Sequence, residues 1–231
     1  VVNASDSYVA PPRALFSHCL DGGPLLIETS ADRATLTEMV DAFRGPQDRA
    51  GTVIVGAGLF PGISNLLAAE LAGTEGMHTL EVAMRFSPLA RGGQGVVNMM
   101  VGMMNTPTTS IVAGARVASA PIAAGALIEF DGKPRKTLHV AFSEPMMLGA
   151  STGIENIRAY MAPVPGIMRP MFLMTPSFLL RNRLFLALTG IYLAVLRRFL
   201  LRWREPPVAM AAVGGDAAGC RRWDRWGVLP I

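Results

Sequence analysis

The chain has 231 residues, of which 51% are hydrophobic and only 16% are charged, so its composition predicts a packed core and excludes a wholly disordered protein. The net charge of +4 is uneven. Residues 1–157 hold 10 Lys or Arg and 14 Asp or Glu, whereas residues 158–231 hold 11 Arg and 3 acids. In the basic last third the arginines flank apolar runs, which favours a membrane or partner surface and argues against nucleic acid.

Residues 1–75 alternate strand and helix signals. Strands are predicted over residues 1–4, 24–29 and 52–55, and helices over residues 11–20, 32–43 and 64–71. Buried parallel strands consist of continuous apolar residues, and residues 25–27 and 53–55 have this pattern. Strand and helix repeats at this spacing predict an α/β arrangement, a parallel sheet with helices packed on it.

From residue 78 the pattern changes to strands joined by turns. Strands are predicted over residues 79–86, 111–117, 127–130, 137–142, 208–213 and 220–223, and helices over residues 96–104 and from 154 to 161. The Asp131-Gly132 turn predicts a hairpin. Together these elements predict an α+β domain with an antiparallel or mixed sheet, and the many methionines are interpreted as core filling.

A long helix is predicted over residues 176–203. Its apolar run of thirteen residues, 184–196, is shorter than the roughly 18–20 residues that span a bilayer, and arginines flank it on both sides. Three interpretations stay open: a helix buried in the core, a helix lying in a membrane interface, and a helix that forms a homodimer.

The glycine-rich segment 56–62 is not expected to form a phosphate loop. A dinucleotide site needs G-x-G-x-x-G between a strand and its helix, and here Pro61 stands where the loop would enter the helix. The segment does follow a predicted parallel strand. It therefore lies at the edge of the sheet where ligands bind in open α/β proteins.

Three segments resemble the saccharopine dehydrogenase-like reductases. Residues 1–4 (VVNA) resemble the strand end V-x-N of that family, and residues 23–30 (GPLLIETS) resemble its G-V-x-Y-V-D-x-S. Residues 58–68 (GLFPGISNLLA) resemble its G-F-x-P-G-x-S-N-L-L-A, which is the most specific of the three. The resemblance covers residues 1–75 well and the rest only loosely. Glu28 stands where the family usually has Asp.

The resemblance implies a fold and an activity. Residues 1–75 would be the C-terminal part of a Rossmann-like nucleotide-binding sheet, and residues 76–231 an α+β substrate or dimerisation domain with a mixed sheet. The parent would be an NAD(P)-dependent oxidoreductase that uses NADP or NAD on C–N or C=C bonds of a small-molecule substrate. Because the family's G-x-G-x-x-G would precede Val1, the chain is expected to be a truncated form that is inactive alone.

The resemblance also assigns the residues that would bind the cofactor. They lie at three predicted strand ends and in the loop that follows the third: Asn3, Ala4, Ser5, Thr29, Ser30, Gly58, Phe60, Pro61, Gly62 and Asn65. The first five would lie near the nicotinamide, and the others would line the crevice at the carboxyl edge of the sheet.

Other residue types add little chemistry. Cys19 and Cys220 have no CxxC spacing, which excludes a disulfide framework and fits a reducing, cytoplasmic setting. His18, His78 and His139 are not spaced for a metal, and no nucleophile elbow is present, so no metal is expected and the catalytic acid and base stay unassigned. The rival interpretation is a non-catalytic protein that contacts a membrane peripherally, or binds a partner, through the Arg-flanked helix.

Overall fold

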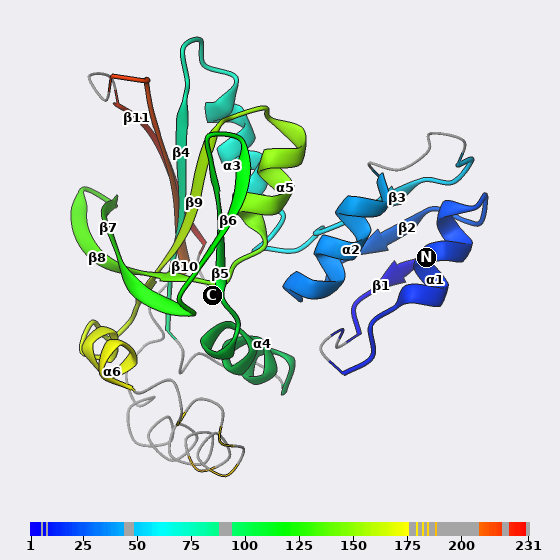
Figure 1. The fold of residues 1–231 in the computed structure, drawn as a ribbon, viewed down its shortest axis with the longest axis horizontal. Helices are drawn as coiled ribbons and strands as arrows, with labels where there is room; N and C mark the ends of the chain where they lie inside the picture. The colour runs from blue at the N-terminus through cyan, green and yellow to red at the C-terminus, as the bar shows by residue number, and fades with distance from the viewer. Residues whose placement is uncertain are drawn as a thin grey trace.

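The computed structural model describes residues 1–5, 7, 9–43, 49–87, 94–175, 208–218 and 222–229, together with Leu179, Asn182, Leu184 and Leu188. Within these residues the chain is a mixed α/β protein with two sheets (Figure 1). A small parallel sheet lies on one side of the molecule, next to the N-terminus. A larger, curled and mainly antiparallel sheet lies on the other side.

The small sheet has three parallel strands in the order β1-β2-β3. Its strands are β1 (Val2–Asn3), β2 (Leu26–Glu28) and β3 (Val53–Ile54), and the connecting helices are α1 (Arg13–Leu20) and α2 (Arg33–Phe43). Asn3 is paired with Glu28 across the first two strands. Apolar side chains from both helices and from β2 form one buried cluster beneath the sheet: Phe16, Cys19, Leu20, Leu26 and Met39. The parallel sheet predicted from strand and helix repeats is confirmed.

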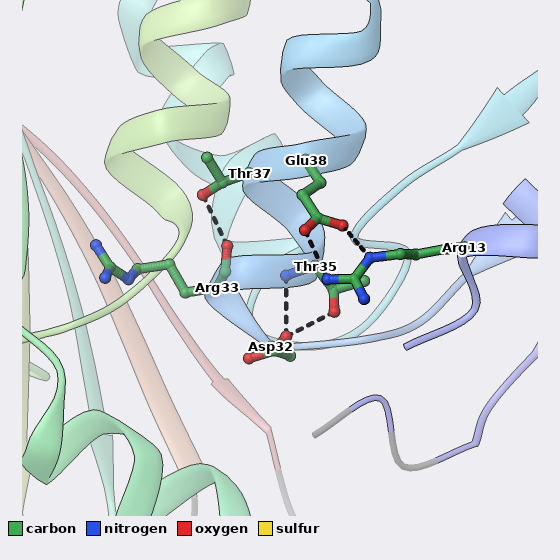
Figure 2. Close-up of polar contacts among 6 residues, drawn as sticks. All are labelled: Arg13, Asp32, Arg33, Thr35, Thr37 and Glu38. Carbon is green, nitrogen blue, oxygen red and sulfur yellow. Dashed lines mark hydrogen bonds and ion pairs between the residues drawn. The ribbon is translucent and has the colours of Figure 1, made fainter. Parts of the chain in front are cut away.

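Helix α2 is held at its start by Asp32 and on one side by Arg13 of α1 (Figure 2). The N–H and the hydroxyl of Thr35 both donate to Asp32 Oδ2, at 2.9 and 2.6 Å, which satisfies donors that the first helical turn leaves open. Arg13 of α1 donates twice to the Glu38 carboxylate, at 2.7 Å each. On the other side Arg33 donates to Thr109 in the larger sheet, so α2 connects the two sheets.

The larger sheet has eight strands. They are β4 (Thr79–Phe86), β5 (Thr108–Val112), β6 (Ala115–Ser119), β7 (Ile122–Phe130), β8 (Lys133–Val140), β9 (Asn156–Pro163), β10 (Val208–Gly215) and β11 (Arg222–Leu229). The order is β11-β10-β4-β9-β5-β6, and the β7–β8 hairpin joins the sheet where β8 pairs with β9. Within this sheet β4 and β9 are parallel, and the other pairs that its described strands form are antiparallel.

The two faces of the larger sheet carry separate apolar clusters. On one face Leu80, Val82 and Met84 of β4 pack with helices α3 (Ile63–Ala72) and α5 (Glu144–Ser151). The helices α4 (Gln94–Asn105) and α6 (Met168–Met174) complete this cluster with buried methionines: Met100, Met103 and Met168. These methionines fill the core, which agrees with the interpretation of the methionines in the sequence.

The opposite, inner face is smaller and is covered by the curled β7–β8 hairpin. Ala83 of β4 contacts Ile128 and Phe130 of β7 there, beside Tyr160 of β9. The small alanine side chains let the hairpin approach the sheet closely, because every second residue of a strand points to the same face.

Two predicted elements are wrong. The helix start predicted over residues 154–161 is the strand β9, which lies between β4 and β5 with Ile157 and Ala159 buried on one face and Tyr160 on the other. A strand buried on both faces loses the alternation that marks it in the sequence. The single strand predicted over residues 111–117 is the β5–β6 hairpin, in which Ala113 and Gly114 form the turn with φ of 48° and 76°.

The predicted last strand pair is confirmed by β10 and β11, although β11 begins two residues later than predicted and extends six residues further. The helix predicted over residues 176–203 lies outside the described residues except at Leu179, Asn182, Leu184 and Leu188. Among the described residues, no helix has both the length and the apolar character needed to cross a membrane.

Candidate functional site

The carboxyl edge of the small sheet holds a row of hydrogen-bonded polar side chains. Asn3 Nδ2 donates to Glu28 Oε2 at 2.6 Å, and the Ser30 N–H donates to Glu28 Oε1 at 2.8 Å. The Glu28 side chain is fully buried, so these two donors replace the water that a carboxylate would otherwise bind. Glu28 therefore fixes the orientation of the Asn3 amide.

The same edge presents two hydroxyl groups around Asn3. Ser5 Oγ donates to Asn3 Oδ1 at 2.8 Å, and Thr29 Oγ1 donates to the Asn3 carbonyl at 2.9 Å. Ser5 and the neighbouring Ala4 are exposed, and Thr29 is half-buried. The structure thus brings Asn3, Ala4, Ser5 and Thr29 together, although they come from two strand ends about 25 residues apart.

The loop over residues 56–62 follows β3 and lies against this row. The Ala57 N–H donates to the Glu28 carbonyl at 2.8 Å, and a Cβ on Gly58 would lie 3.3 Å from the Thr29 carbonyl oxygen. Gly58 therefore approaches Thr29 as the sequence predicts for residues at one sheet edge. The loop crosses from there to α3 and the larger sheet (Figure 1).

The loop closes on itself through its backbone. Gly58 N–H donates to the Pro61 carbonyl at 3.1 Å, and Ile63 and Ser64 N–H groups donate back to the carbonyls of Gly58 and Leu59 at 3.1 and 3.3 Å. A phosphate loop needs such N–H groups free to point at the anion. Since the Gly58, Ile63 and Ser64 N–H groups are used internally, these three donors are not available to a pyrophosphate.

The other residues predicted to bind the cofactor do not lie in the row of polar side chains around Asn3. Phe60 is buried, and its ring packs edge-to-face on Phe142 with centroids 4.4 Å apart. Pro61 is buried beside it, so these two residues anchor the loop in the core of the larger sheet. Gly62 has a φ of +135° and forms the tightest part of the loop. Ser30 is buried, and its Oγ accepts from the Asp32 N–H at 3.1 Å.

A second polar group lies where α3 meets α5, and we name its residues Ser64, Asn65, Glu144 and Met147 the buried acid cluster. Ser64 Oγ donates to Glu144 Oε1 at 3.0 Å, and Asn65 Nδ2 lies 3.4 Å from Met147 Sδ. Two buried oxygens, Glu144 Oε2 and Asn65 Oδ1, have no hydrogen-bond partner among the described residues. Gly56 packs on Met147, so the loop links this cluster to the carboxyl edge.

Burial controls the protonation of Glu144. The side chain is fully enclosed, and this desolvation raises the pKa of Glu144 to about 8, although the backbone N–H groups of Ser143 and Glu144 and the Ser64 hydroxyl lower it. Glu144 is therefore a neutral carboxylic acid at pH 7. A buried neutral acid can donate a hydrogen bond or a proton to a group that reaches Oε2.

No sequence motif marks Glu144 as a candidate site residue. The signal for it is a single acid in the apolar segment 140–150, a position where a carboxyl group becomes buried once the segment packs. Its partner Ser64 lies 80 residues earlier, so no local pattern joins them.

The contacts of His139 and His78 are with a hydroxyl group, an aromatic ring and a carboxylate. His139 Nε2 lies 3.1 Å from Ser110 Oγ, and the ring packs against Tyr160. Burial, with a smaller contribution from Arg158, lowers the pKa of His139. His78 is exposed and lies 3.8 Å from a Glu155 carboxylate oxygen. In the part of the chain that the structure describes, no three His, Cys, Asp or Glu side chains are placed to hold a metal ion.

No protein-family model matches this sequence, and no curated protein matches it. The assignment of a function therefore depends on the residues at the carboxyl edge and on the three segments that resemble the reductases.

Proposed function

We propose that the chain is the nicotinamide-side and substrate part of an NAD(P)-dependent oxidoreductase similar to the saccharopine dehydrogenase-like reductases. The observation that carries the proposal is that Asn3, Thr29 and Gly58, one from each resembling segment, meet at the carboxyl edge of a parallel sheet. Ligands of open α/β sheets bind at this edge. In the proposal the small sheet is the C-terminal part of a Rossmann-like sheet.

The chemistry of the edge fits the nicotinamide half of the cofactor. The Ser5 and Thr29 hydroxyls can exchange hydrogen bonds with a carboxamide, and Gly58 presents no side chain that would fill the space beside them. The pyrophosphate half does not fit here, because the loop N–H groups are used internally and the sequence has no G-x-G-x-x-G. The cofactor, NADP or NAD, supplies the hydride when bound, and the residues of the chain orient the ring.

The substrate in this proposal is a small molecule with a C–N or C=C bond. Among the described residues, the buried acid cluster can hold a proton near the loop, because Glu144 is neutral at pH 7 and its Oε2 has no partner among them. We therefore infer that Glu144, rather than any histidine, supplies a proton or hydrogen bond in the proposed reaction.

The nicotinamide assignment is tested with reduced nicotinamide riboside, which carries the ring but no phosphate. We expect weak, saturable binding with a Kd on the order of 1 mM, measured by fluorescence. Thr29→Val should weaken it about threefold to tenfold, the effect of one neutral hydrogen bond. Thr52→Val is the matched control, because Thr52 precedes β3 at the opposite edge of the same sheet, and it should change nothing.

Two results would overturn the assignment. Absence of saturable riboside binding, or equal weakening by both threonine variants, would remove the nicotinamide from this edge. NADH is expected to bind no more than about threefold tighter than the riboside, since a closed loop adds no phosphate contacts. A hundredfold preference for NADH, on the order of 2.7 kcal/mol, in binding that the riboside competes away would show that the chain holds the pyrophosphate beside the nicotinamide after all.

A further inference from the structure

The inner face of the curled sheet ends in a cavity of about 480 Å³. β4 and β9 run in parallel to this point, the β7–β8 hairpin folds over it, and α6 closes one side. The β7–β8 hairpin and α6 lie on the side of the larger sheet away from the small sheet (Figure 1). It is lined by Arg85, Pro134, Arg135, Lys136, Ala162, Pro163, Val164, Gly166, Arg169 and Pro170.

The sheet itself makes room for this cavity. Arg85 lies on the inner face of β4, and its neighbours across the sheet are Ala162 of β9 and Ala209 of β10. Small side chains on both sides leave the space above the sheet open around the guanidinium. The volume is in the range of about 300–1,000 Å³ that small-molecule sites have in proteins.

Four of the residues that line the cavity are cationic and none is acidic: Arg85, Arg135, Lys136 and Arg169. The side chains of Arg85, Arg135 and Lys136 make no hydrogen bond or ion pair with the side chain or backbone of any described residue. Arg169 is held in place by its Nε, which donates to the Thr137 carbonyl at 2.9 Å. Asp131 at the hairpin tip is an acid whose charge acts on Arg85.

The positive charges of these side chains repel one another. Partial burial, and then the charge of Arg135, lower the pKa of Arg85, while Asp131 acts in the opposite direction. Bringing like charges together costs free energy that an anion would recover. Guanidinium groups match phosphate oxygens with paired N–H donors, and lysine adds a further positive charge.

We propose that this basic cavity binds the phosphate group of a small organic phosphate. The guanidinium groups contact the phosphate, and the apolar walls formed by Pro134, Pro163 and Pro170 contact the organic part of the ligand. The site is separate from the carboxyl edge of the small sheet, so the inference does not depend on the proposed oxidoreductase function. Reduced nicotinamide riboside, which tests that function, has no phosphate.

Pyrophosphate and glucose 6-phosphate serve as soluble probes, titrated by calorimetry against the full chain. We expect one saturable site. Arg85→Gln and Arg135→Gln should each weaken binding at least about tenfold, because each removes a charge-assisted hydrogen bond. Lys133→Gln is the matched control: Lys133 lies on the same hairpin and is exposed, but it does not line the cavity. It should change the affinity less than about twofold.

A phosphate group can also belong to a lipid. Sedimentation with phosphatidylcholine vesicles, with and without phosphatidic acid, separates this source from a soluble ligand. Binding to phosphatidic acid that Arg85→Gln abolishes and Lys133→Gln preserves would assign the site to a lipid phosphate headgroup. Binding to soluble probes only would assign it to a free organic phosphate.

The proposal fails if neither soluble phosphates nor phosphatidic acid bind the folded protein. It also fails if Lys133→Gln weakens binding as much as Arg85→Gln, since that would indicate attraction by the general positive charge. The thermal midpoint of each variant without ligand checks folding, and Arg85→Lys provides a second variant. Lysine keeps the charge but loses the paired donors, so it is expected to bind more weakly than wild type and more tightly than Arg85→Gln.

Discussion

Replacing Glu144 by glutamine is expected to raise the free energy of unfolding at pH 8 by about 4 kcal/mol, and to change it little at pH 4. Glutamine has nearly the shape of a protonated glutamate and can still accept the hydrogen bond from Ser64 Oγ. It differs in having no charge to lose. The effect therefore measures the cost of ionising a fully buried carboxyl group.

The direction follows from the two pKa values of Glu144. The ordinary pKa of 4.5 applies to the unfolded chain, and burial raises the folded value to about 8. Between these values the folded state binds one proton more than the unfolded state, so stability falls as pH rises from about 4.5 to about 8, by roughly 1.4 kcal/mol per pH unit. Below pH 4.5 both states are protonated, and above pH 8 both are ionised, so the loss is complete there.

Urea unfolding of wild type and Glu144→Gln at several pH values measures this effect, because the difference between the two proteins cancels the other titrating groups. Glu129→Gln is the control, since Glu129 is exposed on β7. Its difference from wild type should stay flat. A flat difference for Glu144→Gln as well would mean that Glu144 ionises in the folded protein without cost, and the proposed proton donor at the loop would be lost with it.

The alternation of apolar and polar residues predicts a strand when one of its faces packs against apolar side chains and the other carries polar ones. β4 has the predicted bounds, Thr79–Phe86, because one face packs under α3 and the other lines the inner face, so its residues alternate. The end of α1 at Leu20 and the start of α2 after Asp32 follow from a turn and a capping side chain. β9 fails for the opposite reason, since apolar residues cover both of its faces.

Pairing between distant segments could not be predicted. β4 pairs with β9 on one side and with β10 on the other, and these strands lie about 75 and 130 residues further along the chain. No local pattern contains these partners. The same holds for the basic cavity, whose Arg85 in β4 and Arg169 in α6 lie 84 residues apart in the sequence.

The candidate site was predictable where it depends on strand ends alone. The carboxyl ends of parallel strands share one edge, so Asn3 and Thr29 could be expected to lie together, and Gly58 after the next strand beside them. The burial of Phe60 depends on Phe142, which precedes a helix that the sequence does not predict. The buried acid cluster depends on that same helix.

Gly62→Ala is expected to lower the free energy of unfolding by at least about 3 kcal/mol, and Gly76→Ala by only about 1 kcal/mol. Both glycines have positive φ, +135° and +80°, so both substitutions strain the backbone. The difference lies in the space around them. A Cβ on Gly62 would lie 2.0 Å from the Gly58 carbonyl oxygen and 2.7 Å from that of Gly56, whereas nothing lies within 4 Å of one on Gly76.

The clash at Gly62 cannot be relieved by a side-chain movement, because both nearby atoms are backbone. The Gly58 carbonyl also accepts the Ile63 N–H at 3.1 Å, so moving it would open the start of α3. Thermal and urea unfolding of the two variants measure the difference. Equal losses would show that the loop can change its conformation in the folded protein. In that case its N–H groups could turn toward a phosphate, and the weak preference expected for NADH over the riboside would no longer follow.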